Sequence, residues 1–350
     1  MEKYIGLDVH ATTCTFAVIS QGGRRLKSDV IETNGRALVS YVKQIAGRKH
    51  LVFEEGTQSA WLYEILRPHV DEVAVTVPKE RLRSKSDESD ALALAEALRV
   101  GGLKTRVHKD RGALGSLKEL TLVYSKLLQD SVRAQNRLRA MFRSRGIDSE
   151  GLTSFRDEKE WNAWAAKLPP RMRSPARMLC EEMVVIDALL AQARTAMVNE
   201  AKKHRAWRIL QTCPGLGEIR TAMLMAIVIS PSRFRTSRQF WSYCGLAVTT
   251  HSSADWRRDR EGQWRRREPM TRGLNRAHNR ELKEVFAGAA MTVAAKLPKD
   301  PLHASYQKSV ERGLKPAVAR IHLARKIAAI VLRMWKNMEV YDSAKIRSQK

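Results

Sequence analysis

The beginning of the chain alternates apolar and polar side chains, a pattern that restricts it to strands of a sheet. In KYIGLDVH, residues 3–10, apolar side chains occupy every second position, the period of a β-strand. TCTFAVIS (13–20) and RRLKSDVIET (24–33), on either side of the short turn QGG, are typical of a second and a third strand. Three antiparallel strands are therefore predicted. A carboxylate is costly to bury in such a strand, so Asp8 is expected to hold a ligand.

Helical and strand-like segments then follow one another. The segment NGRALVSYVKQIAG (34–47) has helical spacing, as does SAWLYEILRPHV (59–70), whereas KHLVFEEG (49–56) and DEVAVTVP (71–78) are typical of strands. The order of three strands, helix, strand, helix, strand and helix favours an α/β ribonuclease H-like, or RuvC-like, fold. A doubly wound dinucleotide-binding fold is disfavoured, because no G-x-G-x-x-G follows the first strand.

Four carboxylates mark a candidate metal site in this region. Asp8 lies within the first strand, Glu54 ends the strand 49–56, and Asp87 and Asp90 begin a helix. A spacing of three puts the last two on the same side of that helix. Taken singly, each has a structural explanation, such as helix capping for Asp87, a first-turn charge for Asp90 or solvation for Glu54. Together they predict a site for two Mg²⁺ ions, with Mn²⁺ as the alternative.

The charge of the chain indicates a polyanionic partner. Its 350 residues contain 63 Lys and Arg against 37 Asp and Glu, a formal net charge of +26. Nucleic acid is the commonest partner of such a chain, and an anionic membrane surface is the competing interpretation. We expect no membrane-spanning segment and no signal peptide. The four scattered cysteines are expected to be buried and reduced in the cytoplasm.

The sequence pattern changes after residue 104. Two amphipathic tracts, 113–146 and 174–210, predict long helices that pair as an antiparallel, coiled-coil-like arm across residues 105–205. The first tract presents apolar side chains that include Leu138, Phe142 and Val132. Its second half also carries five arginines, for which a solvated face, nucleic-acid contact and self-association remain open.

The last region, 206–345, is expected to be mostly helical and basic. The sequence Pro214-Gly215-Leu216-Gly217 is similar to the hairpin of a helix-hairpin-helix motif, in which glycines let backbone N–H groups approach a phosphate. It is also compatible with a plain turn between helices. Residues 247–290 then interleave arginines with Trp256 and Trp264, which suits phosphate contact and stacking. The predicted nucleic-acid contacts are Gly215, Gly217, Arg257, Arg258, Arg265, Arg266, Arg272 and Arg276.

Several motifs in both halves of the chain resemble those of one known family. They are YIGLDVH, VFEEG before WLYEIL, KSDESDALALAEAL, CPGLGEI, SYCGL, HSS, TRGLNRAHNREL and ARKIAAIVLRMWK. Residues 4–96 and 208–340 resemble the DEDD transposases of the insertion-sequence-110 family, which includes the pilin gene inverting recombinase. The combination of motifs is specific, although no single motif is.

The resemblance implies roles for individual residues. It assigns metal ligation to Asp8, Glu54, Asp87 and Asp90, preferring Glu54 to its neighbour Glu55. It places a nucleophilic serine at Ser253, but Ala254 stands where the family commonly has glycine, so Ser252 is the alternative. It divides the chain into a RuvC-like metal domain (1–104), the helical arm (105–205) and a C-terminal transposase domain (206–345).

The resemblance also implies an activity and partners. A transposase of this family cuts and rejoins DNA at the ends and target of its element through a covalent serine–DNA link. A structured guide RNA encoded by the element is implied as a second partner. Strand exchange requires more than one active site, so a dimer that assembles further on DNA is expected, at the nucleoid of a bacterial or archaeal cytoplasm.

Two other classes of function remain open at the level of sequence. A hydrolytic, junction-resolvase-like nuclease would use the four acids and water, and would leave no protein-linked product. A non-catalytic nucleic-acid-binding protein would need only charge and the helix-hairpin-helix-like segment. The four acids disfavour the second class, and the match at both ends of the chain disfavours the first.

Overall fold

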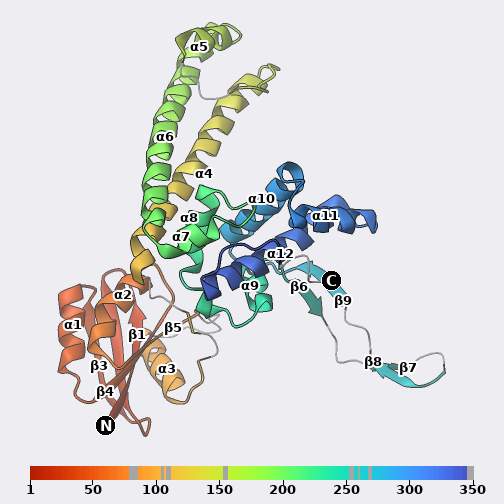
Figure 1. Ribbon diagram of the computed structural model, residues 1–350. Helices are drawn as coiled ribbons and strands as arrows, with labels where there is room; N and C mark the ends of the chain where they lie inside the picture. The colour runs from red at the N-terminus through yellow and green to blue at the C-terminus, as the bar shows by residue number, and fades with distance from the viewer. Residues whose placement is uncertain are drawn as a thin grey trace. The chain divides into compact units, whose positions relative to one another are not determined.

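The computed structural model describes residues 1–78, 86–103, 106–107, 112–152, 157–251, 256–258, 261–266 and 270–344. The chain divides into two compact units, Met1–Gly112 and Ala113–Lys350. Both are drawn in Figure 1, and each is described by itself below.

The first unit is built on a mixed five-stranded sheet with the order β3-β2-β1-β4-β5. Its strands are β1 (Glu2–Val9), β2 (Thr13–Ser20), β3 (Arg25–Glu32), β4 (Arg48–Glu54) and β5 (Glu72–Thr76). β1, β2 and β3 pair antiparallel, whereas β4 runs parallel to both β1 and β5. The predicted meander and the predicted alternation of helices and strands are confirmed.

Helices cover both faces of this sheet. Helices α1 (Gly35–Gln44) and α2 (Ser59–Leu66) bury Leu38 and Leu62 in one core with the β1 residues Ile5 and Leu7. Helix α3 (Asp87–Arg99) buries Leu94 and Leu98 in a second, smaller cluster on the other face with the β4 residue Val52. Because side chains alternate along a strand, every second residue of β1 and β4 faces α3.

The second unit begins with a helical arm. It consists of α4 (Gly115–Arg143), α5 (Glu158–Ala165) and α6 (Pro170–Lys202), and α4 lies alongside α6. Ser131 donates a hydrogen bond to Asp187, and Arg137 pairs with Glu182, so the two helices run in opposite directions.

Two details of the arm differ from the sequence prediction. Val132, which was assigned to the apolar face, is 51% exposed, whereas Leu138 and Phe142 are fully buried. Helix α6 begins at Pro170 and ends at Lys202, earlier at both ends than the predicted tract. Proline is tolerated in the first turn, where its missing N–H has no helical partner, and the chain restarts as α7 (Arg205–Leu210).

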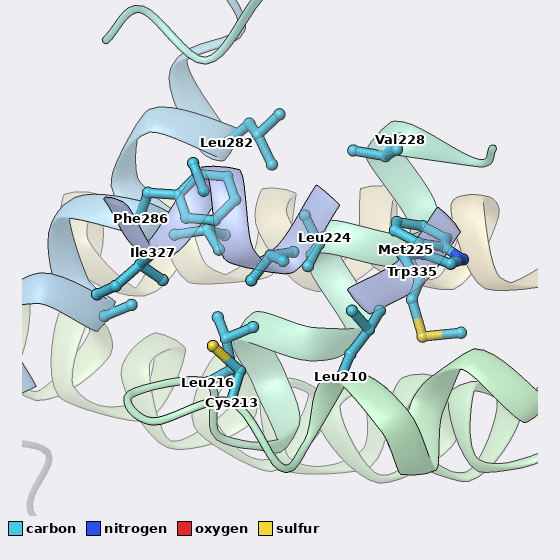
Figure 2. Packing of buried hydrophobic residues seen from close by; sticks show 14 of the residues in the cluster. Leu210, Cys213, Leu216, Leu224, Met225, Val228, Leu282, Phe286, Ile327 and Trp335 are labelled. Carbon is cyan, nitrogen blue, oxygen red and sulfur yellow. The ribbon is translucent and has the colours of Figure 1, made fainter. Parts of the chain in front are cut away.

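The remaining helices share one core with the base of the arm. They are α8 (Glu218–Val228), α9 (Ser237–Tyr243), α10 (Arg280–Lys296), α11 (Pro301–Glu311) and α12 (Pro316–Asn337). Figure 2 shows Leu224 of α8, Phe286 of α10, and Ile327 and Trp335 of α12 in this core. The arm residues Leu117 and Met197 belong to the same cluster.

Short strands form two separate ladders in this unit. Strand β6 (Val248–His251) pairs antiparallel with β9 (Met270–Leu274). Strand β7 (Trp256–Arg258) pairs antiparallel with β8 (Trp264–Arg266). All four cysteines are buried and free, as expected. Across the described residues, we find no helix with the length and apolar character needed to cross a membrane.

Candidate metal centre

Asp8 lies near the end of β1, on the face that α3 covers. The parallel ladder pairs Leu7 with Phe53, so Asp8 and Glu54 are the next residues on two adjacent strands. Leu7 and Phe53 are fully buried in the core below α1 and α2, and alternation therefore turns Asp8 and Glu54 to the opposite face.

A histidine and two aspartates converge at this point. Nε2 of His10 lies 3.2 Å from Oδ2 of Asp8 and 3.2 Å from Oδ2 of Asp87. The three potential ligand atoms all lie within 4.8 Å of one another. The Asp8 side chain is only 14% exposed, whereas the Asp87 side chain, at 59%, is open to solvent. We call Asp8, His10 and Asp87 the acid–histidine cluster.

The hydrogen bonding of this cluster is incomplete. Oδ2 of Asp8 and Nε2 of His10 are buried, and no described residue gives either atom an aligned hydrogen bond. The 3.2 Å separation between them has the length of an ion pair but lacks hydrogen-bond geometry. A buried polar atom without a partner costs about 1–3 kcal/mol. A bound cation would satisfy both carboxylates and the imidazole at once.

Local chemistry fixes the start of α3. The Ser86 side chain caps the helix by accepting a hydrogen bond from the Ser89 N–H. The first turn carries Asp87, Glu88 and Asp90, which interact favourably with the helix dipole. Glu88 turns to Arg25 of β3 in an ion pair. The sequence of this turn thus sets where the helix begins, and Asp87 is its first residue.

Gly6 sets how closely α3 approaches β1. A Cβ at this position would lie 1.8 Å from the carbonyl oxygen of Ala91 and 2.7 Å from the amide nitrogen of Ala95. Any side chain would therefore push the helix away from the strand. Since Gly6 and Asp8 share one face of β1, the glycine is what lets Asp87 reach the end of the strand.

Glu54 borders a cavity beside the cluster. The cavity has a volume of about 250 Å³ and is lined by Asp8, His10, Glu54, Glu55 and the turn into α2. Glu54 and Glu55 therefore both border the same cavity as Asp8. The Glu55 N–H donates a hydrogen bond to the carbonyl oxygen of Thr76 at 2.7 Å.

The structure therefore groups the four predicted acids unequally. Asp8 and Asp87 are in the cluster, Glu54 is at the adjacent cavity, and Asp90 is in neither group. Asp90 lies one turn along α3, where its N–H donates to the Ser86 carbonyl oxygen at 3.1 Å.

Sequence reasoning left out His10. Its position two residues after Asp8 was the available signal, because strand alternation puts the two residues on one face. The donor set of two carboxylates and one imidazole fits a divalent cation. Carboxylates suit Mg²⁺ and Mn²⁺, whereas an imidazole ligand is more typical of transition metals.

The helix-hairpin-helix-like segment lies between α7 and α8. Gly215 has a φ of +84°, and a Cβ there would lie 2.5 Å from the Ala289 carbonyl oxygen of α10. Contact with α10 thus requires glycine whether or not a phosphate binds. Gly217 is the exposed N-cap of α8. Phosphate contact by these two glycines stays a prediction.

The other predicted nucleic-acid contacts are placed unevenly. Arg258 and Arg265 are exposed on β7 and β8, and Arg276 is exposed after β9. Arg257, Arg266 and Arg272 belong to these strands, but their side chains are outside the described part of the structure. Ser252 and Ser253 also lie outside the described residues.

The arm arginines have partners within the arm. Arg133 pairs with Asp130, and Arg137 pairs with Glu182. The other three bind near the tip. Arg139 donates to the Leu152 carbonyl oxygen, Arg143 to the Ser149 hydroxyl at 2.9 Å, and Arg145 to the Met172 sulfur at 3.1 Å. This basic run therefore contributes to the structure of the arm.

The fold and the site define a class: an α/β unit with acids and a histidine at one end of its sheet, joined to a basic, mostly helical unit. A family model of the DEDD transposases of IS110 elements, described as a transposase, matches residues 5–145. A second, described as transposase IS116/IS110/IS902 family, matches residues 207–307. Together they match more than half of the chain, which belongs to the IS110 family of transposases.

A curated relative agrees with this assignment. The chain is 25% identical over 180 residues to the transposase for insertion sequence element IS1111A of Coxiella burnetii. The match covers 49% of this chain and 48% of the relative, so the chain spans about half the length of the curated protein that it matches.

Proposed function

We propose that this protein is the transposase of an insertion sequence, which cuts and rejoins DNA by metal-assisted attack of a serine on a phosphodiester. The observation that carries the proposal is the acid–histidine cluster, in which the Asp8 and Asp87 carboxylates lie within 4.8 Å of each other and of His10. The strand order of the first unit supports a ribonuclease H-like, RuvC-like fold, and the family membership supports the reaction class.

The proposed metal ligands are Asp8, Glu54, Asp87 and Asp90, together with His10. When bound there, divalent cations such as Mg²⁺ would neutralise phosphate charge and stabilise the attacking and leaving oxygens. The chain's own contribution is to hold the carboxylates ready: β1 and β4 carry Asp8 and Glu54, and α3 carries the other two.

Ser253 is the proposed nucleophile. Its Oγ forms a bond to phosphorus while one P–O bond to a neighbouring deoxyribose breaks. The serine proton passes to the departing deoxyribose oxygen, which leaves as a hydroxyl. The serine–DNA ester keeps the bond energy, so the reverse attack by a DNA hydroxyl rejoins a strand. Exposed arginines such as Arg258, Arg265 and Arg276 would neutralise the phosphates around it.

The proposed partners are DNA and a structured guide RNA. Both are polyanions, which fits the net charge of +26. A dimer that assembles further on DNA would supply the several active sites that strand exchange needs. The proposed location is the nucleoid of a bacterial or archaeal cytoplasm.

Covalent capture tests the proposal. Full-length protein is incubated with Mg²⁺, its guide RNA and DNA carrying the element junction, then quenched in denaturant and separated on a gel. The expected result is a protein–DNA band that disappears in both Ser253→Ala and Asp8→Ala. Glu64→Gln is the matched control, because Glu64 is an exposed acid of α2 that does not line the cavity.

Two outcomes would contradict parts of this proposal. If Ser252→Ala removes the band and Ser253→Ala keeps it, the nucleophile is Ser252. Cleaved DNA without any linked protein identifies a hydrolytic nuclease, in which the acids act with water and the serine only contacts phosphate.

A further inference from the structure

The β7–β8 hairpin has an unusual composition. Its two strands each read Trp-Arg-Arg, so the ladder consists of two tryptophans and four arginines. The antiparallel register pairs Trp256 with Arg266 and Arg258 with Trp264. Since residues two apart or directly opposite share a face, Trp256, Arg258 and Trp264 lie on one face of the hairpin.

Both indole rings on this face are open to solvent. Trp256 is 60% exposed and Trp264 is 59% exposed, and neither belongs to a buried cluster of the described residues. The Arg258 guanidinium lies over the Trp264 ring, 5.2 Å from its centroid. This cation–π contact leaves most of the surface of the two rings uncovered.

The chemistry of this face distinguishes between forms of nucleic acid. Arginines alone suffice to bind the phosphates of a duplex, whose bases are stacked on each other and present only their edges. Exposed indole rings beside arginine are suited to binding unstacked bases, because every base has a flat face that stacks on an aromatic ring.

We propose that the face formed by Trp256, Arg258 and Trp264 stacks the unpaired bases of the DNA strand beside the phosphodiester that is cut. The choice of this strand rests on the proposed function. Trp256 follows Ser253 by three residues, so the chain keeps their Cα atoms within about 11 Å. A strand linked to Ser253 is thus within reach of the hairpin.

Binding of short oligonucleotides tests this proposal without any chemistry. The full-length chain in EDTA is titrated into a fluorescently labelled oligo(dT) of about 12 nucleotides, a length within the range of sites bound by stacking platforms. The matched duplex and the oligo(U) ribonucleotide are titrated in parallel. Salt of about 0.2 M weakens the non-specific part of binding by a basic chain.

The expected result is a selective loss of affinity. Trp256→Ala and Trp264→Ala should each weaken oligo(dT) binding about tenfold and change duplex binding less than about twofold. Trp264→Phe, which keeps an aromatic face, should retain most of the affinity. Trp61→Ala is the matched control, because Trp61 is a partly exposed tryptophan of α2 in the first unit and its loss should change neither titration.

Each other outcome overturns the proposal. Equal losses for single strand and duplex would reduce the hairpin to a phosphate contact, and no loss in either variant would exclude it from binding. A tryptophan dependence confined to oligo(U) would assign the face to RNA. Failure of the proposed function is seen separately, because it would appear as absence of Asp8-dependent covalent capture while the oligonucleotide result stands.

Discussion

Two groups of carboxylates and a histidine lie at opposite ends of the same sheet, and they differ in how their hydrogen bonds are satisfied. At the start of β1, β4 and β5, the His50 ring donates to Glu2 at 2.6 Å and to Glu72 at 2.8 Å. At the end of β1, Nε2 of His10 lies 3.2 Å from both Asp8 and Asp87. Neither contact of His10 is an aligned hydrogen bond.

The difference separates a structural group from one organised for a ligand. Both ring nitrogens of His50 face carboxylates, so both must donate, and the ring is a cation between two anions. Burial opposes that charge, but Glu2 and Glu72 outweigh burial and raise the pKa of His50. In the acid–histidine cluster, by contrast, no described residue gives Oδ2 of Asp8 or Nε2 of His10 an aligned hydrogen bond. Two acids and a histidine therefore indicate a ligand-binding site only where their hydrogen bonds are incomplete.

The largest expected effect comes from Asp8→Asn. Loss of the central carboxylate should reduce strand cleavage by about 10²–10³-fold. It should leave the melting temperature unchanged or higher, because it removes one of two neighbouring negative charges. Covalent capture and thermal unfolding measure the two effects on one sample. A clear fall in melting temperature would mean that Asp8 is structural, as Glu72 is expected to be.

Gly6→Val should have the next largest effect. The new side chain would collide with the Ala91 backbone and displace α3, which destabilises the unit by about 2–3 kcal/mol and moves Asp87 from Asp8. Thermal unfolding measures the loss. Gly22→Ala is the control, since a Cβ there would meet only the Ser20 hydroxyl at 4.0 Å. Equal stability of the two variants would show that α3 does not depend on close approach.

Metal addition should distinguish the two groups directly. A cation that binds only the folded chain, and is present at ten times its dissociation constant, stabilises the folded chain by about 1.4 kcal/mol. Mg²⁺ or Mn²⁺ should therefore raise the melting temperature of the unmodified protein and of Glu72→Gln, but not that of Asp8→Asn. An equal rise in all three proteins would place the cation elsewhere.

The smallest effect concerns the pH dependence of the satisfied group. Since the pKa of folded His50 is raised, its stabilisation is complete below its unfolded value of about 6.5 and is lost as pH rises through the folded value. Burial raises the pKa of the Glu72 carboxyl, but His50 and Arg106 lower it by more. The contribution of Glu72 is consequently lost only as pH falls through that lowered value.

His50→Gln measures this contribution. The variant should be less stable than the unmodified protein by about 1 kcal/mol near pH 6, the upper end of the range for ion pairs near the surface, because the His50 side chain is only 18% exposed. The difference should shrink as pH rises. Thermal unfolding at several pH values follows it. A difference that stays constant with pH would mean that His50 acts through packing alone.

Local pattern was sufficient for much of this molecule. The pattern of apolar side chains predicted β1 to β5 in their order along the chain, with alternation clearest in β1, although helices cover both faces of the sheet. It also identified Asp8 as a carboxylate that the sheet does not need. The long helices of the arm followed from their apolar spacing, although Val132 showed that an apolar residue in such a pattern can still face solvent.

Charge was harder to interpret from sequence. The arginines of α4 and those of the β7–β8 hairpin look alike as runs of letters. Only the structure distinguishes them, since Arg139 and Arg143 bind the loop at the arm tip whereas Arg258 lies over an exposed tryptophan. The residue that an arginine contacts depends on which distant segments of the chain fold next to it. A local sequence pattern does not contain that information.

The sequence alone determined the strands, the helices, the basic character and the family resemblance, because each depends on residues close together in the chain or on their composition. The tertiary structure decided that His10 joins Asp8 and Asp87, that Glu54 borders the adjacent cavity and that Asp90 lies apart. The physical reason is the contact of Gly6 with Ala91. It seats α3 against β1 and so brings together side chains that are far apart in sequence.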